Sequence, residues 1–388
     1  MSGRRLHAVS AGGASGEDGL RICPSCVRRS WLLATLAPHL EVVRGRRGAV
    51  REVLALPNDE LVHALDPHGA RAVLDAAERL DLHALRATWG RAGTTAICRH
   101  APGYPAGLLD ASDPPFALHV YGASEHFGAL LGPDARAVAI VGSRRASPDG
   151  AEIAAGIARG LSAAGITVIS GMAMGIDAAA HRGALSAGAR TVAVLASGPE
   201  IASPARESRL HRELHERALV ISELPPGTRP WTWAFPARNR IIAGLAQMTV
   251  IVEAAERSGS LITAEIAADL GRDVGAVPGS PLSWRSAGSN ALLRDGAQLI
   301  RSAADVVDEV IGLSADPAAP REPASLRPVG LAPALLGLLE DIDGGRDSVA
   351  ALAAAPRPVG SVLAGLSELE LLGHVRRDLS GRYSRVRA

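Results

Sequence analysis

The sequence predicts an α/β protein with a mostly parallel, doubly wound sheet, a helical domain before the sheet and a winged-helix domain after it. Apolar residues recur at helical spacing from Val27 to about Trp89. Strand-like and helix-like segments then alternate from Ala137 to Val277. Such alternation is typical of parallel sheets, because each helix carries the chain back to the start of the next strand. A stretch rich in alanine, proline and charge precedes three further helical segments.

Length and composition limit the class of protein. A chain of 388 residues is longer than one hydrophobic core normally spans, so two or three domains are expected. The sequence has no uninterrupted run of about 18 apolar residues, and its first residues lack the apolar block of a signal peptide. We therefore expect a cytoplasmic protein that does not contact a membrane.

Changes in composition along the chain predict five segments. Residues 1–22 are polar and rich in glycine and serine, which indicates a disordered tail. We expect a helical, SAM-like domain at 23–103 and the sheet domain at 104–313. A linker at 314–328 then leads to the winged-helix domain at 329–388.

Strands are predicted where short runs of apolar and β-branched residues end at glycine, serine or charged residues. These runs are Ala137–Val141, Thr167–Ser170, Thr191–Leu195, Leu219–Ser222, Met248–Glu253 and Val274–Val277. Helical windows such as Ala151–Ala164 and Ile176–Ala187 lie between them. The order of the strands in the sheet does not follow from these patterns.

The last part of the chain predicts three short helices and a basic hairpin. The helices are expected at Leu331–Leu339, Ser348–Ala353 and Ser361–Leu371, and the hairpin runs from Gly373 to Val386. Three helices and a hairpin are typical of a winged helix-turn-helix. The alternative is a packing or dimerisation module whose basic strand is simply solvated.

Every basic residue is an arginine, since the sequence contains no lysine among its 41 basic residues. A Walker phosphate loop needs a lysine, and so do pyridoxal and aldolase-type Schiff bases, so these classes are excluded. With a net charge of only +1, any binding of nucleic acid must use a local arginine patch. A compositionally biased genome explains the absence of lysine equally well, but not where the arginines cluster.

The three cysteines are too few for a disulfide framework. Cys23-x-x-Cys26 has the spacing of half a zinc site. The remaining ligands would have to come from Cys98, His39 and His63, which have no regular spacing. The sequence therefore predicts neither a metal nor a cofactor.

Two loops that follow predicted strands carry residues suited to phosphate. Gly142, Ser143 and Arg144 follow the first strand, and Gly171 follows the second. Ligands of open α/β sheets bind at the carboxyl ends of strands, where backbone N–H groups cradle phosphate. Neither loop has the G-x-G-x-x-G spacing with a following acid, so NAD is discounted. Gly171 alternatively serves only a tight turn and close helix packing.

A third phosphate-binding segment is predicted at the start of a helix after the fifth strand. Ser258 and Ser260 flank Gly259 there, and Thr263 follows one turn later. No histidine or lysine is near in sequence to activate the hydroxyls. The two serines therefore fit helix caps and anion ligands better than nucleophiles.

Arginine and aromatic residues occur together between the fourth and fifth strands. Arg238 and Arg240 follow Trp231, Trp233 and Phe235, which are among the few aromatic residues of the chain. Single-stranded nucleic acid is bound by this combination, because arginines pair with phosphates while bases stack on rings. A solvated surface role for both arginines is the alternative.

Several segments together resemble the DNA-processing protein A (DprA, or Smf) family. They are Val141-Gly142-Ser143-Arg144, Ser170-Gly171-Met172-Ala173 with Gly175, Ile176, Asp177 and His181, Ser222-Glu223 with Pro226-Gly227, Phe235-Pro236 with Arg238-Asn239-Arg240-Ile241-Ile242, Glu253 to Ala264, Val277-Pro278-Gly279, Gly288-Ser289-Asn290 and Asp295-Gly296-Ala297. The resemblance runs from about Tyr104 to Ala297. It implies an extended Rossmann-like fold that binds single-stranded DNA, forms a homodimer and helps load the RecA recombinase during natural transformation.

From the residues and this resemblance we predict a non-enzymatic protein that binds and protects single-stranded DNA. The phosphate-binding residues are expected to be Gly142, Ser143, Arg144, Gly171, Arg238, Asn239, Arg240, Ser258, Gly259, Ser260 and Thr263. Phe235 is the candidate for base stacking. The competing class is a nucleoside-monophosphate phosphoribohydrolase, whose related Rossmann-like fold would use Glu253 or Glu265 as the acid.

Overall fold

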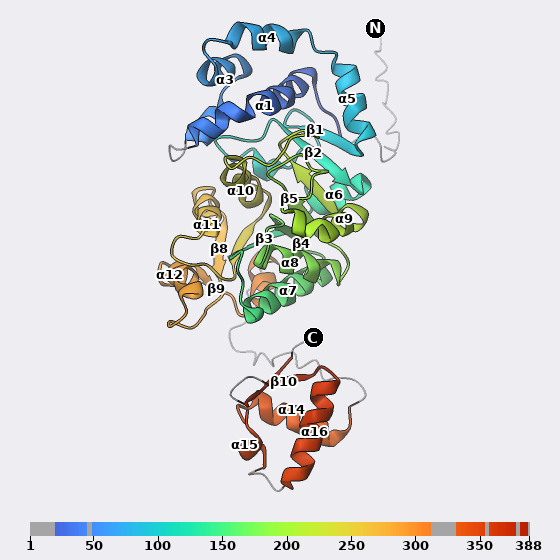
Figure 1. Cartoon of the computed structure of the whole chain (residues 1–388), viewed down its shortest axis with the longest axis vertical. Coiled ribbons are helices and arrows are strands. Elements are labelled where there is room, and N and C mark those ends of the chain that lie inside the picture. The colour runs from blue at the N-terminus through green and yellow to red at the C-terminus, as the bar shows by residue number, and fades with distance from the viewer. Residues whose placement is uncertain (1–19, 45–48, 312–330, 354–356, 378–380, 387–388) are drawn as a thin grey trace, which may run out of the picture. The chain divides into compact units, whose positions relative to one another are not determined.

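The structure is a computed structural model that describes residues 20–44, 49–311, 331–353, 357–377 and 381–386 (Figure 1). The chain forms two compact units, residues 1–314 and 315–388. Most of the predicted tail and all of the predicted linker lie outside the described residues. In the described part of the chain, no helix has both the length and the apolar character needed to cross a membrane.

The first unit is built on one mixed sheet in the order β1-β2-β6-β5-β4-β3-β7-β8-β9. The strands are β1 (Thr94–Cys98), β2 (Ala117–Gly122), β3 (Ala137–Val141), β4 (Thr167–Ser170), β5 (Thr191–Val194), β6 (Leu219–Ser222), β7 (Met248–Ile251), β8 (Asp273–Ala276) and β9 (Gln298–Leu299). The seven strands β3 to β9 pair in parallel, whereas β2 runs antiparallel to β6 and β1. The predicted doubly wound, Rossmann-like sheet is confirmed.

All six predicted strands are present: three have the predicted ends, and the ends of the other three differ by one or two residues. The sequence did not predict β1, β2 or β9 as strands. In β2 the run from Leu118 to Tyr121 is short and carries a histidine, so its pattern does not identify a strand without its partner β6. β9 contains only two residues, which is too short for any periodic signal.

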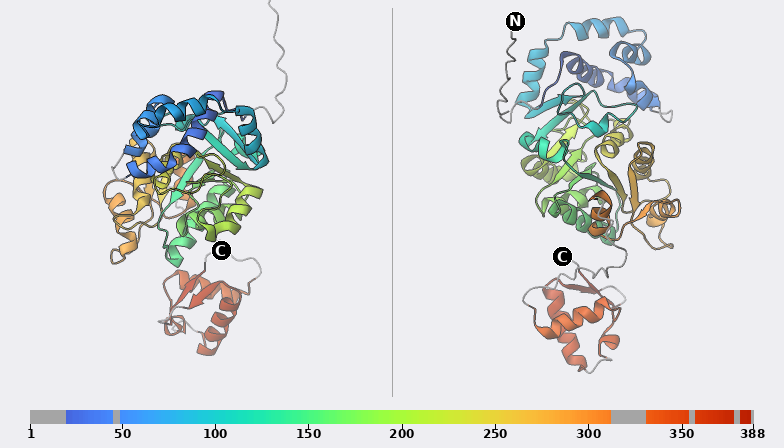
Figure 2. Two further views of the ribbon diagram at one scale, coloured as in Figure 1. Left: turned by 45° about the horizontal axis from the view of Figure 1, so that its top comes forward. Right: turned by 180° about the vertical axis from the view of Figure 1, so that it is seen from behind.

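Helices cover both faces of the sheet (Figures 1 and 2). In β3, Val138 and Ile140 pack with α7 and α8, while Ala139 and Val141 share a core with α10 on the other face. The first face is covered by α7 (Pro148–Ala163), α8 (Ile176–Leu185), α9 (Ser208–Arg217) and α13 (Ala303–Ile311). The second face is covered by α6 (Phe127–Leu131), α10 (Ala234–Leu245) and α11 (Gly259–Asp269), and α12 (Ala287–Arg294) lies beside β8. Buried strands with apolar side chains on both faces require this two-sided cover.

The predicted N-terminal helices form part of the first unit. They are α1 (Pro24–Val43), α2 (Ala49–Ala55), α3 (Asn58–Leu65), α4 (Ala70–Glu78) and α5 (Leu82–Arg91). Their core includes Trp233 and Leu224 from the sheet region. Trp233 is buried, and its indole Nε1–H donates to the carbonyl of Ala37 in α1 at 3.1 Å. The helices are thus anchored to the loop before α10, next to the carboxyl ends of the central strands.

In its described residues the second unit has three helices and a two-stranded hairpin, which is the arrangement of a winged helix-turn-helix. The helices are α14 (Pro333–Asp343), α15 (Val349–Ala353) and α16 (Val359–Leu371), and the strands are β10 (Val375–Arg377) and β11 (Tyr383–Arg385). Two hairpin arginines form ion pairs with α14 and the following loop: Arg385 with Asp343, and Arg382 with Asp347 at 2.7 Å. Much of the positive charge of this hairpin is therefore neutralised by acidic residues of its own unit.

Candidate nucleic-acid interface

A cavity of about 1010 Å³ lies where the strand order of the sheet reverses. β3 is the central strand, with β4 on one side and β7 on the other, so the chain winds away from it in both directions. The loop after β3 and the loop between β7 and α11 both line the cavity. Open α/β sheets bind their ligands at this kind of crevice, because the loops at the strand ends diverge there.

The structure brings together most of the residues that the sequence predicted for the site. Those that line the cavity are Gly142, Ser143, Arg144, Phe235, Arg238, Asn239, Ser258, Gly259, Ser260 and Thr263. Gly171 and Arg240 do not line it. A residue that lines the cavity need not be free to contact a ligand. The individual contacts separate the residues whose polar groups are used within the protein from those whose polar groups are open to the cavity.

The backbone groups at Gly142, Ser143 and Gly171 are engaged within the protein. The Ser143 amide donates to the carbonyl of Glu253 at 2.7 Å, and the Gly171 amide donates to Asp177 Oδ2 at 3.1 Å. Gly142 also hydrogen-bonds Asp177 through its backbone. Burial raises the pKa of Asp177, against the opposing effects of Arg238 and these amides. These amides are therefore used to shape the loops, whereas Ser143 lines the cavity and its hydroxyl stays a predicted phosphate donor.

Arg238 lies in the floor of the cavity with its guanidinium turned inward. Its Nη1 donates to the carbonyls of Gly171 at 2.7 Å and Val194 at 2.6 Å, and only 8% of the residue is exposed. Burial lowers its pKa to about 10, although the nearby Asp177 opposes the shift. Two backbone carbonyls occupy Nη1, so a phosphate contact by Arg238 stays a prediction that would have to use another atom of the guanidinium.

Arg238 also explains the glycine at position 171. A Cβ atom added to Gly171 would lie 2.1 Å from Nη1 of Arg238, far inside any permitted contact. The glycine is needed for close packing of the guanidinium, which supports the packing role left open in the sequence.

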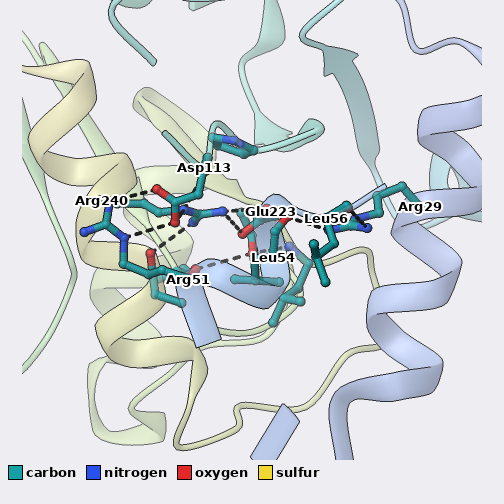
Figure 3. Close-up of polar contacts among 12 residues, drawn as sticks. Arg29, Arg51, Leu54, Leu56, Asp113, Glu223 and Arg240 are labelled. Carbon is teal, nitrogen blue, oxygen red and sulfur yellow. Dashed lines mark hydrogen bonds and ion pairs between the residues drawn. The ribbon is translucent and has the colours of Figure 1, made fainter. Parts of the chain in front are cut away.

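Arg240 is a buried cation, and Figure 3 shows it beside Asp113 and Glu223. Its Nη2 donates to both carboxylate oxygens of Glu223, and its Nε lies 2.9 Å from Asp113 Oδ2. Arg51 of α2 reaches the other oxygen of Asp113 at 2.8 Å. Burial alone lowers the pKa of Arg240, but Glu223 and Asp113 outweigh it and raise the pKa. The prediction that Arg240 binds phosphate is wrong, because two buried carboxylates neutralise it.

The exposed cations at the cavity are Arg144 and Arg145 after β3, Arg257 before α11 and Arg44 from the end of α1. Arg44 pairs with Glu41 at 2.7 Å. Within the described part of the chain, Arg144, Arg145 and Arg257 form no ion pair with an acidic side chain. These three form a positive rim, which we call the arginine rim. Arg144 was identified as a site residue from the sequence. Arg257 lay inside a segment that resembles the DprA family, but it was not named for the site. Only the tertiary fold brings Arg44 to the cavity.

The start of α11 is the part of the predicted phosphate site that remains open. Ser258 is the N-cap, and its Oγ accepts from the amide of Ser260 at 3.4 Å and lies 2.7 Å from the Ser260 hydroxyl. Asn239 donates from Nδ2 to the carbonyl of Gly259 at 3.5 Å, which positions this turn. Thr263 lies deeper and is buried. A helix N-terminus attracts anions because its first amides are unpaired and its dipole is positive there.

The aromatic side chains differ sharply in their availability for stacking. Trp233 is buried, and Phe235 packs partly against the N-terminal helices with Arg144 5.4 Å above its ring. Trp284 lines the cavity and is 59% exposed, and Arg285 lies 4.7 Å from its ring. Sequence reasoning missed Trp284, because nothing in its immediate neighbours marks it as part of the site.

Comparison with known proteins identifies the family. The family model described as DNA recombination-mediator protein A matches residues 95–311, which is more than half of the chain. The chain belongs to this family. The resemblance seen in the sequence motifs is therefore confirmed.

Individual members of the DNA recombination-mediator protein A family are similar over much of their length. DNA processing protein DprA of Streptococcus pneumoniae is 42% identical over 206 residues, covering 53% of this chain and 71% of the relative. A putative DprA of Mycobacterium tuberculosis is 34% identical over 296 residues, covering 74% of this chain and 72% of the relative.

Solved structures of the same family share the fold. The X-ray structure of Streptococcus pneumoniae DprA matches with a TM-score of 0.60 at 31% identity, over 75% of this chain and 99% of that chain. DNA processing protein A of Helicobacter pylori matches with a TM-score of 0.50 at 26% identity, over 56% of this chain and 96% of that chain. The Helicobacter pylori protein is described as having a unique single-stranded DNA binding mode.

One acidic residue in this family member is held by helix α7. Glu253 accepts from the amide of Ser147 at 2.9 Å and from its hydroxyl at 2.5 Å, next to Gly150 of the first turn. Ser147 is the N-cap of α7, so Glu253 holds the capping residue in place. Glu265 lines the cavity and is exposed.

Proposed function

We propose that the protein binds single-stranded DNA along the cavity at the carboxyl ends of β3 and β7 and acts as a recombination mediator. The observation that supports this most directly is the arginine rim beside the N-terminus of α11 and the exposed ring of Trp284. Phosphate needs cations and unpaired amides, whereas bases need flat apolar surfaces. The cavity offers both within one crevice.

The proposed contacts assign separate roles to the residues. Arg144, Arg145 and Arg257 pair with phosphates, and Ser258 with the first amides of α11 accepts one further phosphate. Trp284 stacks on a base at the edge of the cavity. Phosphate contacts and stacking carry little sequence information, so binding is independent of base sequence.

The family relationship extends the proposal to partners. The Helicobacter pylori relative is described as binding single-stranded DNA, and we assign the same ligand to this chain. We further propose that the protein works as a homodimer in the cytoplasm, protects incoming strands during transformation and helps load RecA onto them. It acts without catalysing a reaction and without a membrane partner.

A binding titration tests the central proposal. Fluorescence anisotropy with labelled oligonucleotides of mixed sequence, single-stranded and duplex, is expected to show clearly tighter binding of the single strand. The triple variant Arg144→Ala/Arg145→Ala/Arg257→Ala should lose this binding, whereas Arg209→Ala and Arg212→Ala, exposed on α9 away from the cavity, should retain it. Equal affinity for duplex, or full binding by the triple variant, would contradict the proposal.

RecA loading is tested separately from binding. RecA filament formation on strands covered by single-strand binding protein should be faster when this protein is added, and light scattering during size-exclusion chromatography should give the mass of a dimer. Strand binding without faster filament formation would limit the function to protection.

The phosphoribohydrolase alternative rests on Glu265, an exposed acid in a cavity that is lined by arginines. Glu253 does not serve it, because Ser147 holds that carboxylate. Incubation with the common nucleoside monophosphates is expected to release no free base above the rate of a heat-denatured control. Release that disappears in Glu265→Gln would establish the enzymatic function instead.

A further inference from the structure

Three cysteines and one histidine converge at the junction between the N-terminal helices and the edge of the sheet. They are Cys23, Cys26, Cys98 and His100, and their ligand atoms all lie within 4.8 Å of one another. Cys23 is the N-cap of α1 and Cys26 lies in its first turn, whereas Cys98 ends β1 and His100 follows in the next turn. Neither His39 nor His63, which the sequence offered as ligands, belongs to this group; the Nδ1 of His63 lies 2.8 Å from the carbonyl of Asp59.

We propose that these four side chains bind one structural zinc ion. The geometry is the first argument. Nδ1 of His100 lies 3.4 Å from Cys23 Sγ, 3.4 Å from Cys26 Sγ and 3.9 Å from Cys98 Sγ. A tetrahedral zinc with Zn–S of about 2.3 Å and Zn–N of about 2.0 Å separates a sulfur from a nitrogen ligand by about 3.5 Å. The three distances lie around that value.

Hydrogen bonding among the four side chains does not account for this convergence. A neutral imidazole nitrogen has one in-plane lone pair, so Nδ1 of His100 can accept from one thiol, not from three. All three cysteines are free thiols rather than disulfides. Four ligand atoms gathered within 4.8 Å of one another are explained by an ion between them.

The surroundings are those of a closed metal site. The amide of Cys23 donates to Cys98 Sγ at 3.4 Å, and amide donors of this kind stabilise a metal-bound sulfur. Cys23 and Cys26 lie at the N-terminus of the long helix α1, whose dipole favours negative charge. Ile22, Phe116 and Ala117 pack around the sulfurs and restrict water. Three thiolates and one imidazole in a closed tetrahedral set are the ligands of structural zinc sites.

The zinc ion would fasten α1 to β1 and close the loop that contains all five N-terminal helices. Closing a long loop lowers the entropy of the unfolded chain and so stabilises the folded one. The same helices carry Arg44, which lines the cavity, and Arg51, which pairs with Asp113. The site is thus structural, and it does not depend on the proposed DNA-binding function.

Metal content of the tag-free full chain tests the proposal. After purification with a thiol reductant, about one zinc per chain is expected by mass spectrometry of the metal, as for other sites of this ligand set. Replacement of zinc by Co²⁺ should produce the visible bands of a tetrahedral site and a thiolate charge-transfer band in the near ultraviolet. Prolonged chelation should lower the midpoint of thermal unfolding followed by tryptophan fluorescence.

Ligand variants locate the metal. Cys98→Ser and His100→Asn should lose the zinc, while His63→Asn, an exposed histidine of the same helical region, should keep it. If the first two variants do not fold, His100→Cys keeps the proposal testable, because four thiolates should retain zinc and shift the Co²⁺ bands.

Two results would overturn the proposal. The first is a reduced full chain that binds neither Zn²⁺ nor Co²⁺ and exposes three titratable thiols after unfolding. The second is a chain that lacks metal and has only one thiol, which would show that two of the cysteines form a disulfide.

Discussion

The Nη2 atom of Arg240 donates to both carboxylate oxygens of Glu223, at 2.8 and 2.9 Å, and the side chains are only 1% and 9% exposed. Glu223 follows β6 and Arg240 lies in α10, so the pair joins two segments that the sequence presented as separate motifs. Asp113 completes the set as a second carboxylate beside Arg240 (Figure 3). Both motifs therefore serve the packing of α10 against the sheet.

Arg240→Ala is expected to lower the free energy of unfolding by about 3–5 kcal/mol, because it leaves two buried carboxylates without their partner. Urea unfolding followed by tryptophan fluorescence measures this, since all five tryptophans belong to the first unit. Arg145→Ala, on the arginine rim, should change stability by less than about 0.5 kcal/mol. If the Arg240→Ala variant is as stable as the wild type and its DNA affinity changes, Arg240 contacts DNA and the prediction is wrong.

Arg144→Ala should weaken binding to every single-stranded oligonucleotide by a similar factor, because phosphates carry no base information. The slope of log affinity against log salt should flatten by about 0.7, the value for one phosphate contact on a single strand. Arg212→Ala, exposed on α9, is the matched control and should leave the slope unchanged. Effects of Arg144→Ala that vary with base sequence would contradict a phosphate contact.

Trp284→Ala should cost about 1–3 kcal/mol of binding free energy for single-stranded DNA, the usual value of one stacked base. Trp284→Phe should recover part of this loss, because a smaller ring still stacks. Leu282→Ala removes a side chain of the same loop that is 96% exposed and should have no effect on binding. If Trp284→Ala binds normally, the stacking role passes to Phe235.

Gly171→Ala should lower the free energy of unfolding by about 1–3 kcal/mol, as expected for overpacking. The added methyl group would lie 2.1 Å from the Arg238 guanidinium. Gly156→Ala is the control, because an added Cβ in that turn of α7 meets no atom within 4 Å. It should be neutral or stabilise the protein by about 0.4–1 kcal/mol. Equal effects of both changes would show that Arg238 moves aside freely.

The pH dependence of stability should include a contribution from His119 of β2. Burial lowers the pKa of His119 to about 3, so the unfolded chain binds a proton there more readily than the folded one. This contribution to stability is nearly complete above a pH of about 7.5 and declines as the pH falls, by about 1.4 kcal/mol between about pH 7.5 and 5.5. Burial also lowers the pKa of His181 to about 3, so its contribution to stability falls with pH in the same way.

His119→Gln should therefore show a shallower fall in unfolding free energy over that interval, while the exposed His63→Gln should behave as the wild type. The measurement is urea unfolding at both pH values. An unchanged pH dependence in His119→Gln would mean that the folded protein already protonates this histidine.

Local pattern determined much of the architecture. Strands such as Ala137–Val141 and Leu219–Ser222 were predicted with their observed ends, because apolar runs between turn residues have few other conformations available. The N-cap at Ser258 was likewise visible, since a cap depends on neighbours only two or three residues away. These features depend on contacts between residues close in sequence.

Only the tertiary structure decided which arginines face the cavity. Arg144, Arg238 and Arg240 look alike in the sequence, yet Arg144 is exposed, Arg238 holds two backbone carbonyls and Arg240 lies between two acids. The carbonyl of Val194 and the carboxylate of Asp113 are distant in sequence from the arginines that they contact, so no local pattern predicts these contacts.

The same limit applies to Trp284 and to the group formed by Cys23, Cys26, Cys98 and His100. The C-x-x-C spacing was visible and Cys98 was named as a possible partner, but His100 was not, because both lie at the end of β1, beyond five helices. The sequence alone determines which side chains are present and the local structure that carries them. Burial and the approach of distant partners determine what each charge or ligand can do, because both depend on how the elements pack.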